Sequence, residues 1–163
     1  MISKKSISDI PKLVFAEPRI AGNTGAAIRL CANTGSVLHL IEPLGFDLDD
    51  AKLRRSGLDY HDLTHLQVHK SFADFLEFTT CPKRRIFAFR TQAKVKYTHI
   101  QYSPDDYLLF GSEPSGLPER IWKNSFVSQC LYIPMRSYSR SINLANSAAI
   151  ALYEAYRQLD FPK

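Results

Sequence analysis

The chain has 163 residues, the length of one compact domain, and its 45% hydrophobic and 23% charged residues are ordinary for a globular protein. No apolar run approaches the roughly 20 residues needed to cross a bilayer. Residues 1–12 lack the apolar core of a secretory signal, so we expect a cytoplasmic protein. The formal net charge of +5 is compatible with a polyanionic partner such as RNA, although many basic proteins bind no nucleic acid.

Apolar runs alternate with helical patterns along the whole chain, which predicts an α/β fold with a parallel sheet flanked by helices. We expect a single domain over residues 1–163, of which 1–11 form an N-terminal extension. The first half predicts, in order, a strand over Lys12–Glu17, a helix over Thr24–Asn33, a strand over Ser36–Glu42, a short charged helix over Asp49–Ser56, a strand over Leu66–His69 and a helix over Phe72–Phe78.

In the second half, short bounded apolar runs are typical of buried parallel strands. The last helix is the clearest in the chain, because apolar residues recur along it at three- and four-residue spacing. The elements expected are strands over Arg85–Phe89 and Asp106–Phe110, an irregular connection over Thr91–Ser103, a helix over Pro118–Lys123, a strand over Val127–Ile133 and the last helix over Ser141–Leu159.

Three junctions rich in Gly, Asn or Ser follow predicted strands, which is where parallel α/β sheets bind ligands. In the first junction, over Glu17–Arg29, the simplest interpretation is that Asn23 caps the following helix. Arg29 lies farther along that helix, where it could meet a phosphate or a ribose hydroxyl.

The second junction, over Phe110–Pro118, has Gly111 and Gly116 at the spacing of a phosphate-binding loop. Leu117 and Pro118 stand where such a loop needs Lys and Ser or Thr, which excludes that interpretation. The chain also lacks the GxGxxG pattern, which disfavours a nicotinamide-dependent oxidoreductase. What remains is a glycine-opened turn that holds the carboxylate of Glu113 and lets a flat ligand lie against bare backbone.

The third junction, over residues 133–146, leads into the last helix. Ser141 could cap that helix, but a cap does not require so many hydrogen-bonding side chains. The polar residues of this junction are Ser137, Ser139, Arg140, Ser141, Asn143 and Asn146.

His61, His65 and His69 are each four residues apart, a spacing that would align metal ligands on a continuous helix. The residues between them alternate like a strand, which would scatter the three side chains. Cys31, Cys81 and Cys130 are widely spaced and form no CxxC pair. We therefore expect no metal and no disulfide scaffold.

The three junctions, in this order, resemble the three motifs of the SPOUT superfamily of RNA methyltransferases, over about Lys12–Leu159. The stretch Leu38–His61 is similar to the small members that 2′-O-methylate the wobble nucleotide, cytidine or a modified uridine, of leucine tRNAs. The resemblance implies S-adenosylmethionine as cofactor, the anticodon stem-loop of tRNA as substrate, a C-terminal trefoil knot and a homodimer. Methylation of another tRNA or rRNA site, or a non-catalytic RNA-binding module, stays open.

The resemblance also implies roles for individual residues. The catalytic set is Arg29, Asn23, Glu113 and Ser139, and the cofactor set is Phe89, Gly111, Ile133, Ser141, Met135, Leu108 and Asn146. Tyr153, Arg140, Arg54 and Arg55 are expected to contact RNA or the second protomer. Arg29 is expected to act beside the partner protomer's cofactor, and we favour electrostatic stabilisation of the ribose oxygen because arginine rarely deprotonates.

Overall fold

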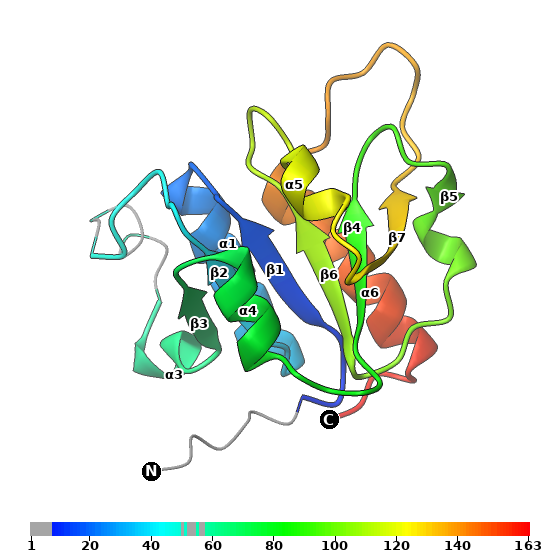
Figure 1. Ribbon diagram of the computed structural model, residues 1–163. Helices are drawn as coiled ribbons and strands as arrows, with labels where there is room; N and C mark the ends of the chain where they lie inside the picture. The colour runs from blue at the N-terminus through cyan, green and yellow to red at the C-terminus, as the bar shows by residue number, and fades with distance from the viewer. Residues whose placement is uncertain (1–7, 50, 52–54, 56–57) are drawn as a thin grey trace.

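The computed structural model describes residues 8–49, 51, 55 and 58–163. The described residues form a seven-stranded sheet with the order β3-β2-β1-β6-β4-β7-β5 (Figure 1). Every strand pair is parallel. The strands are β1 (Lys12–Ala16), β2 (Leu38–Ile41), β3 (Leu66–His69), β4 (Arg85–Phe89), β5 (Val95–Lys96), β6 (Asp106–Phe110) and β7 (Val127–Tyr132).

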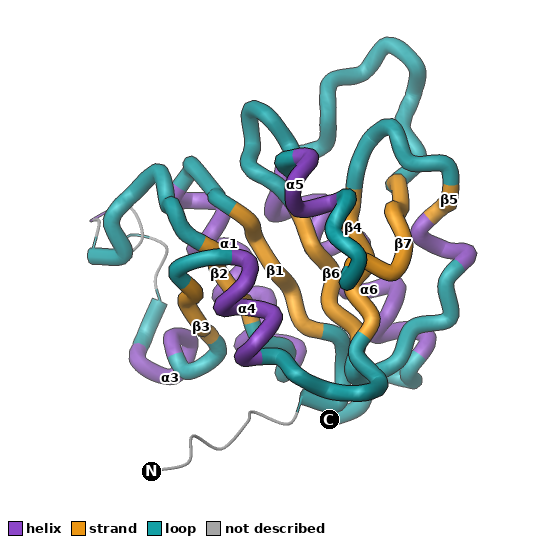
Figure 2. The backbone as a smooth tube through the Cα atoms, viewed as in Figure 1, coloured by secondary structure: helices purple, strands orange, loops and turns teal. Residues whose placement is uncertain are grey.

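Helices cover both faces of this sheet (Figure 2). They are α1 (Ala21–Thr34), α3 (Tyr60–Leu63), α4 (Phe72–Phe78), α5 (Glu119–Trp122) and α6 (Leu144–Gln158), with a 3-10 turn at Tyr97–His99. None of the helices in the described part of the chain has the length and apolarity needed to span a membrane. The expected α/β class, a parallel sheet flanked by helices, is confirmed.

Two apolar cores, one on each face of the sheet, hold the layers together. Because successive strand residues point to opposite faces, Leu13 of β1 packs in the same core as Ile28 of α1 and Leu152 of α6. Its neighbour Val14 packs in the other core, beside Phe75 of α4. This alternation fixes the strand register and leaves the strand ends free to carry polar loops.

The predicted strands are all present, but several boundaries differ. The helix predicted from Thr24 begins at Ala21, and the last helix begins at Leu144, not at Ser141. The sequence pattern did not predict α3 or β5, because a four-residue helix and a two-residue strand show no periodicity. The helix expected over Asp49–Ser56 lies largely outside the described residues.

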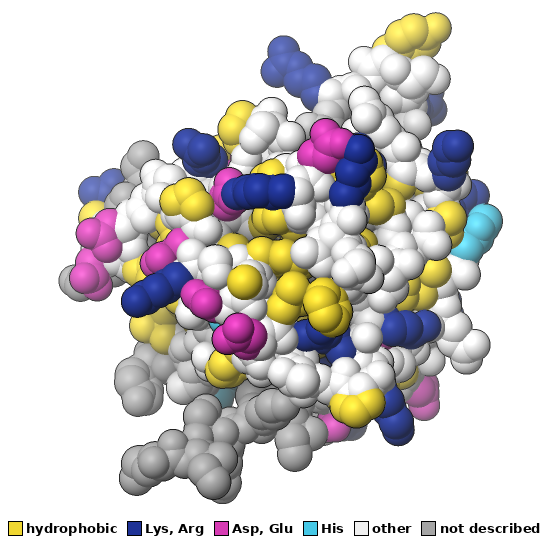
Figure 3. Space-filling model, viewed as in Figure 1, with side chains coloured by type: hydrophobic (Ala, Val, Ile, Leu, Met, Phe, Trp, Pro, Cys, Tyr) yellow, Lys and Arg dark blue, Asp and Glu magenta, His cyan; other side chains and the backbone are white. Residues whose placement is uncertain are grey.

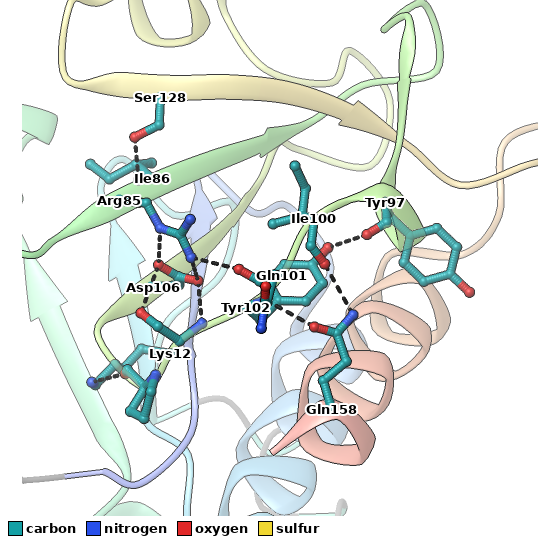
Figure 4. A network of polar contacts seen from close by, with 12 residues as sticks. Lys12, Arg85, Ile86, Tyr97, Ile100, Gln101, Tyr102, Asp106, Ser128 and Gln158 are labelled. Carbon is teal, nitrogen blue, oxygen red and sulfur yellow. Dashed lines mark hydrogen bonds and ion pairs between the residues drawn. The ribbon is translucent and has the colours of Figure 1, made fainter. Parts of the chain in front are cut away.

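At the amino end of the sheet, an ion pair with a buried carboxylate joins neighbouring strands (Figure 4). Asp106 is fully buried at the start of β6, and its two carboxylate oxygens accept hydrogen bonds from Nε and Nη2 of Arg85 at 2.8 and 2.7 Å. Gln158 of α6 accepts from the backbone N–H of Tyr102 and donates to the carbonyl of Ile100. These contacts tie the loop before β6 to the sheet and to the last helix.

A pair of buried histidines lies between the sheet and α4. His39 and His69 are 4% and 6% exposed, and their rings are joined by a hydrogen bond of 2.9 Å between Nδ1 and Nε2. Phe75 and Tyr107 pack edge-on against the ring of His39. Burial, together with the neighbouring His69, lowers the pKa of His39 to about 3.

This lowered pKa makes the stability of the fold depend on pH. Below about pH 6.5 the unfolded chain takes up a proton on His39 that the folded chain does not bind, so stability is lost as the pH falls. We expect the free energy of unfolding to drop by about 2 kcal/mol from this residue between pH 7 and pH 5. Urea titrations at both pH values should show a smaller drop for His39→Gln and the full drop for the exposed control His61→Gln. Equal drops in the two variants would contradict the assignment.

Candidate active site

A cavity of about 470 Å³ opens at the edge where the parallel strands end. Its walls are the segments that follow β4 (residues 89–92), β6 (110–117) and β7 (141–144), with the start of α1. A narrower recess of about 80 Å³ continues from it, lined by Phe89, Phe110, Ile133, Met135 and neighbouring residues. The junctions after β6 and β7 meet here because parallel strands carry their carboxyl ends to one edge.

The turn after β6 exposes bare backbone to the cavity. A Cβ atom on Gly111 would lie 2.0 Å from the carbonyl carbon of Gly116 and 2.1 Å from the nitrogen of Leu117. Ser112 and Gly116 close the turn by exchanging backbone hydrogen bonds, and Gly116 has a φ of +69°, which favours glycine. Close backbone approach therefore requires glycine at position 111, and the left-handed backbone conformation favours glycine at position 116.

A chain of hydrogen bonds connects the three junctions. The Glu113 carboxylate accepts from the backbone N–H of Arg19 at 2.7 Å and from the Asn23 side-chain amide at 3.1 Å. Asn143 donates from Nδ2 to Oδ1 of Asn23 at 3.0 Å. Residues separated by 90 and 120 positions in the sequence are thus held in one polar cluster beside the cavity.

The same cluster corrects both helix caps expected from the sequence. Asn23 lies inside α1 and does not cap it; the N-cap residue is Ile20, which makes no side-chain cap. The Glu113 carboxylate instead accepts from the N–H of Ile20, at the positive end of the helix dipole. On α6 the cap is Asn143, whose side chain accepts from the N–H of Asn146, and not Ser141.

Most of the expected cofactor residues lie around the cavity and its recess. Phe89, Gly111 and Ser141 line the cavity, and Ile133 and Met135 line the recess. Leu108 does not line either space, because its side chain is fully buried in the apolar core that β6 shares with α1 and α6. Asn146 is also absent from the lining; Ser147, one residue farther along α6, takes that place.

The expected catalytic residues divide into two groups. Asn23 and Glu113 line the cavity, but their polar atoms hold the loops together. Arg29 and Ser139 are exposed and do not line the cavity.

The expected RNA or dimer contacts are exposed wherever they are described. Arg140 lies on the loop before α6, Tyr153 is 47% exposed on α6, and Arg55 is exposed. Arg54 lies outside the described residues.

The part of the cavity wall that follows β4 was not predicted from the sequence. Arg90, Thr91 and Gln92 line the cavity, although the stretch that contains Thr91 and Gln92 was expected to be a plain connection. The rule that ligands bind at the carboxyl ends of parallel strands could have found them, because they directly follow a predicted buried strand. These three residues lack the glycine and asparagine content that marked the other junctions as ligand sites.

The three histidines do not form one cluster, although the rings of His61 and His65 are in edge contact, with centroids 5.7 Å apart. His61 belongs to α3, whereas His69 ends β3, and no group of three or more metal-ligating side chains occurs among the described residues. The three cysteines are unpaired. Complete burial raises the pKa of the Cys31 thiol to about 12, which rules it out as a nucleophile at neutral pH.

Comparison with known proteins identifies the family. The model of the SpoU rRNA Methylase family matches residues 11–153. The chain belongs to this family. Membership confirms the RNA methyltransferase resemblance of the three junctions, which all lie within the matched residues.

Individual relatives cover nearly the whole chain. A tRNA (cytidine(34)-2′-O)-methyltransferase of Escherichia coli (strain K12) is 46% identical over 150 residues, which are 92% of this chain and 94% of the relative. A solved structure described as giving insights into 2-OH methylation of C/U34 on tRNA has a TM-score of 0.83 and 44% identity, and the match covers 91% of this chain and 95% of that one. A SpoU methyltransferase of Streptomyces viridochromogenes, solved in complex with AdoMet, shares the fold at a TM-score of 0.82 and 23% identity, over 100% of this chain and 64% of that one.

The close approach at Gly111 predicts that this position tolerates no side chain. Gly111→Ala should lower the free energy of unfolding by about 1–3 kcal/mol, because the backbone of the turn has to move away from the new methyl group. Gly22→Ala is the matched control, since a Cβ there meets nothing within 4 Å and the residue lies in α1. Denaturant unfolding of both variants measures the difference, and equal stabilities would refute the argument.

The polar cluster predicts coupled effects on stability. Glu113→Gln should lower the free energy of unfolding by about 1–3 kcal/mol, because one acceptor oxygen becomes a donor facing N–H groups. The loss should not add to that of Asn23→Ala, since both substitutions remove the same hydrogen bond. Glu119→Gln, an exposed carboxylate paired with Lys123, should leave stability unchanged. Strictly additive losses at Glu113 and Asn23 would show that the cluster does not act as a unit.

Proposed function

We propose that the protein transfers a methyl group from S-adenosylmethionine to the ribose 2′-oxygen of the wobble nucleotide, position 34, of tRNA. The substrates are cytidine or a modified uridine in leucine tRNAs, as the resemblance over Leu38–His61 implies. Relatives at 46 and 44% identity, matched over nearly their full length, are described by this reaction or by its site on tRNA. The observation that carries the proposal is the convergence of the three motif junctions on one cavity, joined through Glu113, Asn23 and Asn143.

The cofactor is S-adenosylmethionine, in keeping with membership of a methylase family. Its sulfonium supplies an activated methyl group, so the protein mainly has to position the reactants. Gly111 and Ser141 would contact the cofactor in the cavity. Phe89, Ile133 and Met135 would contact it in the recess. Phe89 is stacked on Phe110, with ring centroids 4.5 Å apart, which makes this wall a rigid apolar surface.

The ribose hydroxyl is weakly acidic, so a cation that stabilises the developing oxyanion is needed. Arg29 fits this role, and its place on the exposed side of α1 explains why it does not line the cavity of its own chain. In a homodimer paired through α1 and α6, Arg29 would reach the partner's cofactor. The exposed Ile150 and Tyr153 of α6, 37% and 47% accessible, would be covered by the same contact.

Several further features belong to the proposal. Basic side chains, with some acidic ones among them, lie on the face drawn in Figure 3. Arg19, Lys70 and Arg120 are exposed near the carboxyl ends of the strands and suit an anionic RNA approaching the cavity. The proposal includes the C-terminal trefoil knot that the resemblance implies; residues 141–144 and 147 line the same cavity as 89–92 and 110–117. We also infer that residues 1–163 act as one domain, in the cytoplasm.

Methyl transfer itself tests the proposal. Purified protein with labelled S-adenosylmethionine should methylate tRNA from a strain that lacks the modification, and nucleoside mass spectrometry should find the label on the ribose of position 34. Label on another nucleotide, or on rRNA, would move the substrate assignment, whereas cofactor binding without transfer to any RNA would favour a non-catalytic RNA-binding module.

Arg29→Ala should abolish transfer and leave cofactor affinity unchanged, since the residue lies outside the cavity of its own chain. Lys83→Ala, an exposed lysine before the amino end of β4, is the matched control and should keep full activity. Loss of cofactor affinity in Arg29→Ala would show that its role is misassigned.

A mixed dimer tests whether Arg29 acts across the interface. Co-expression of Arg29→Ala with Gly111→Ala, followed by tandem-tag purification, yields dimers in which one site combines an intact cavity with an intact Arg29 from the other chain. Activity should return in these dimers, although each variant alone is inactive. No recovery in verified mixed dimers would place Arg29 at the site of its own chain.

A further inference from the structure

Arg90 stands out because it is a basic residue in the wall of the cavity. It directly follows β4 and lines both the cavity and the apolar recess. Among the described residues that line these two spaces, Arg90 is the only basic one, and Glu113 is the only acidic one. Because the carboxylate of Glu113 is engaged by the start of α1, Arg90 is the charged residue of this lining that is left to meet a ligand.

Trp122 of α5 holds the guanidinium of Arg90 in place. The guanidinium carbon lies 3.6 Å from the centroid of the Trp122 ring, the distance of a stacked cation–π contact. The backbone N–H of Arg90 donates to the carbonyl of Leu131 at 2.9 Å, which fixes the start of the side chain as well. A half-buried, stacked guanidinium loses little conformational freedom when it binds a ligand.

The hydrogen-bonding edges of this guanidinium are unused within the described part of the chain. Arg85, by contrast, donates hydrogen bonds from Nε and Nη2 to the Asp106 carboxylate and from Nη2 to the Gln101 carbonyl. The nearby carboxylate of Glu119 interacts with the charge of Arg90, but its hydrogen bond and ion pair are made with Lys123. Arg90 therefore offers a fork of N–H donors to a planar oxyanion, the geometry that binds carboxylates in two parallel hydrogen bonds.

We propose that Arg90 binds the carboxylate of the methionine part of S-adenosylmethionine, and that Trp122 is the positioning residue that aims it. The inference rests on the proposed function. A carboxylate is favoured over an RNA phosphate because Arg90 lies at the junction of the polar cavity and the apolar recess. A ligand with an apolar ring system at one end and a carboxylate at the other would span both spaces.

Paired ligands that differ in the carboxylate test this assignment. S-adenosylhomocysteine carries the carboxylate, whereas 5′-methylthioadenosine lacks the whole amino acid end. Titration calorimetry of Arg90→Gln should show about 10- to 100-fold weaker binding of S-adenosylhomocysteine, the loss expected for a charged hydrogen-bonded pair. Binding of 5′-methylthioadenosine should change by less than about twofold, which also verifies that the variant is folded.

Two further variants sharpen the test. Trp122→Leu keeps the charge and removes its support, so it should weaken binding of S-adenosylhomocysteine selectively but by less than Arg90→Gln. Lys83→Gln removes one positive charge away from the cavity and should leave both affinities unchanged.

Each other outcome has a distinct meaning. Equal weakening of the two ligands in Arg90→Gln would overturn the carboxylate assignment and leave Arg90 a structural part of the wall. Unchanged affinities with a raised KM for tRNA would assign Arg90 to RNA. If the wild-type protein bound neither ligand, the proposed function itself would fail, independently of Arg90.

Discussion

The carboxylate of Glu113 is the contact on which the site depends. It lies on the turn after β6, yet it accepts hydrogen bonds from the backbone at the start of α1 and from the amide of Asn23. The first N–H groups of a helix lack partners within the helix, and a carboxylate there also meets the positive end of the helix dipole. The Glu113 side chain thereby helps to fix the position of α1 relative to the cavity. Asn23 in turn accepts a hydrogen bond from Asn143, which connects α1 to the start of α6.

The amino and carboxyl ends of the strands carry different kinds of contact. At the amino edge, the buried Asp106 and its bidentate Arg85 consume their hydrogen-bonding capacity on each other and on adjacent backbone. At the carboxyl edge, loops lie around an open cavity and keep donors such as those of Arg90 for a ligand. This division follows from parallel strands, whose apolar residues fill both cores and leave only the ends for polar chemistry.

The sequence was sufficient for features that depend on local pattern and insufficient for those that depend on contacts between distant segments. The strands were predictable because bounded apolar runs are buried on both faces, and the three junctions because glycine and asparagine mark sharp turns. The caps were not predictable: Asn23 looks like a cap locally, but Glu113 arrives from 90 positions away to satisfy the start of α1. Leu108 and Arg90 show the same limit, since only strand packing decides that the first is buried and the second reaches the cavity.

The placement of the two arginines separates cofactor binding from catalysis within the proposed mechanism. Arg90 lines the cavity of its own chain and is stacked on Trp122, where its charge would act on a bound ligand. Arg29 lies on the exposed side of α1 and outside that cavity, where in the proposed homodimer its charge would act on the partner's site. Each protomer would then bind cofactor alone but complete a reaction only in a pair. In that mechanism the dimer would be a chemical requirement of the site, because a cofactor cavity without the second chain would lack the cation that stabilises the ribose oxygen.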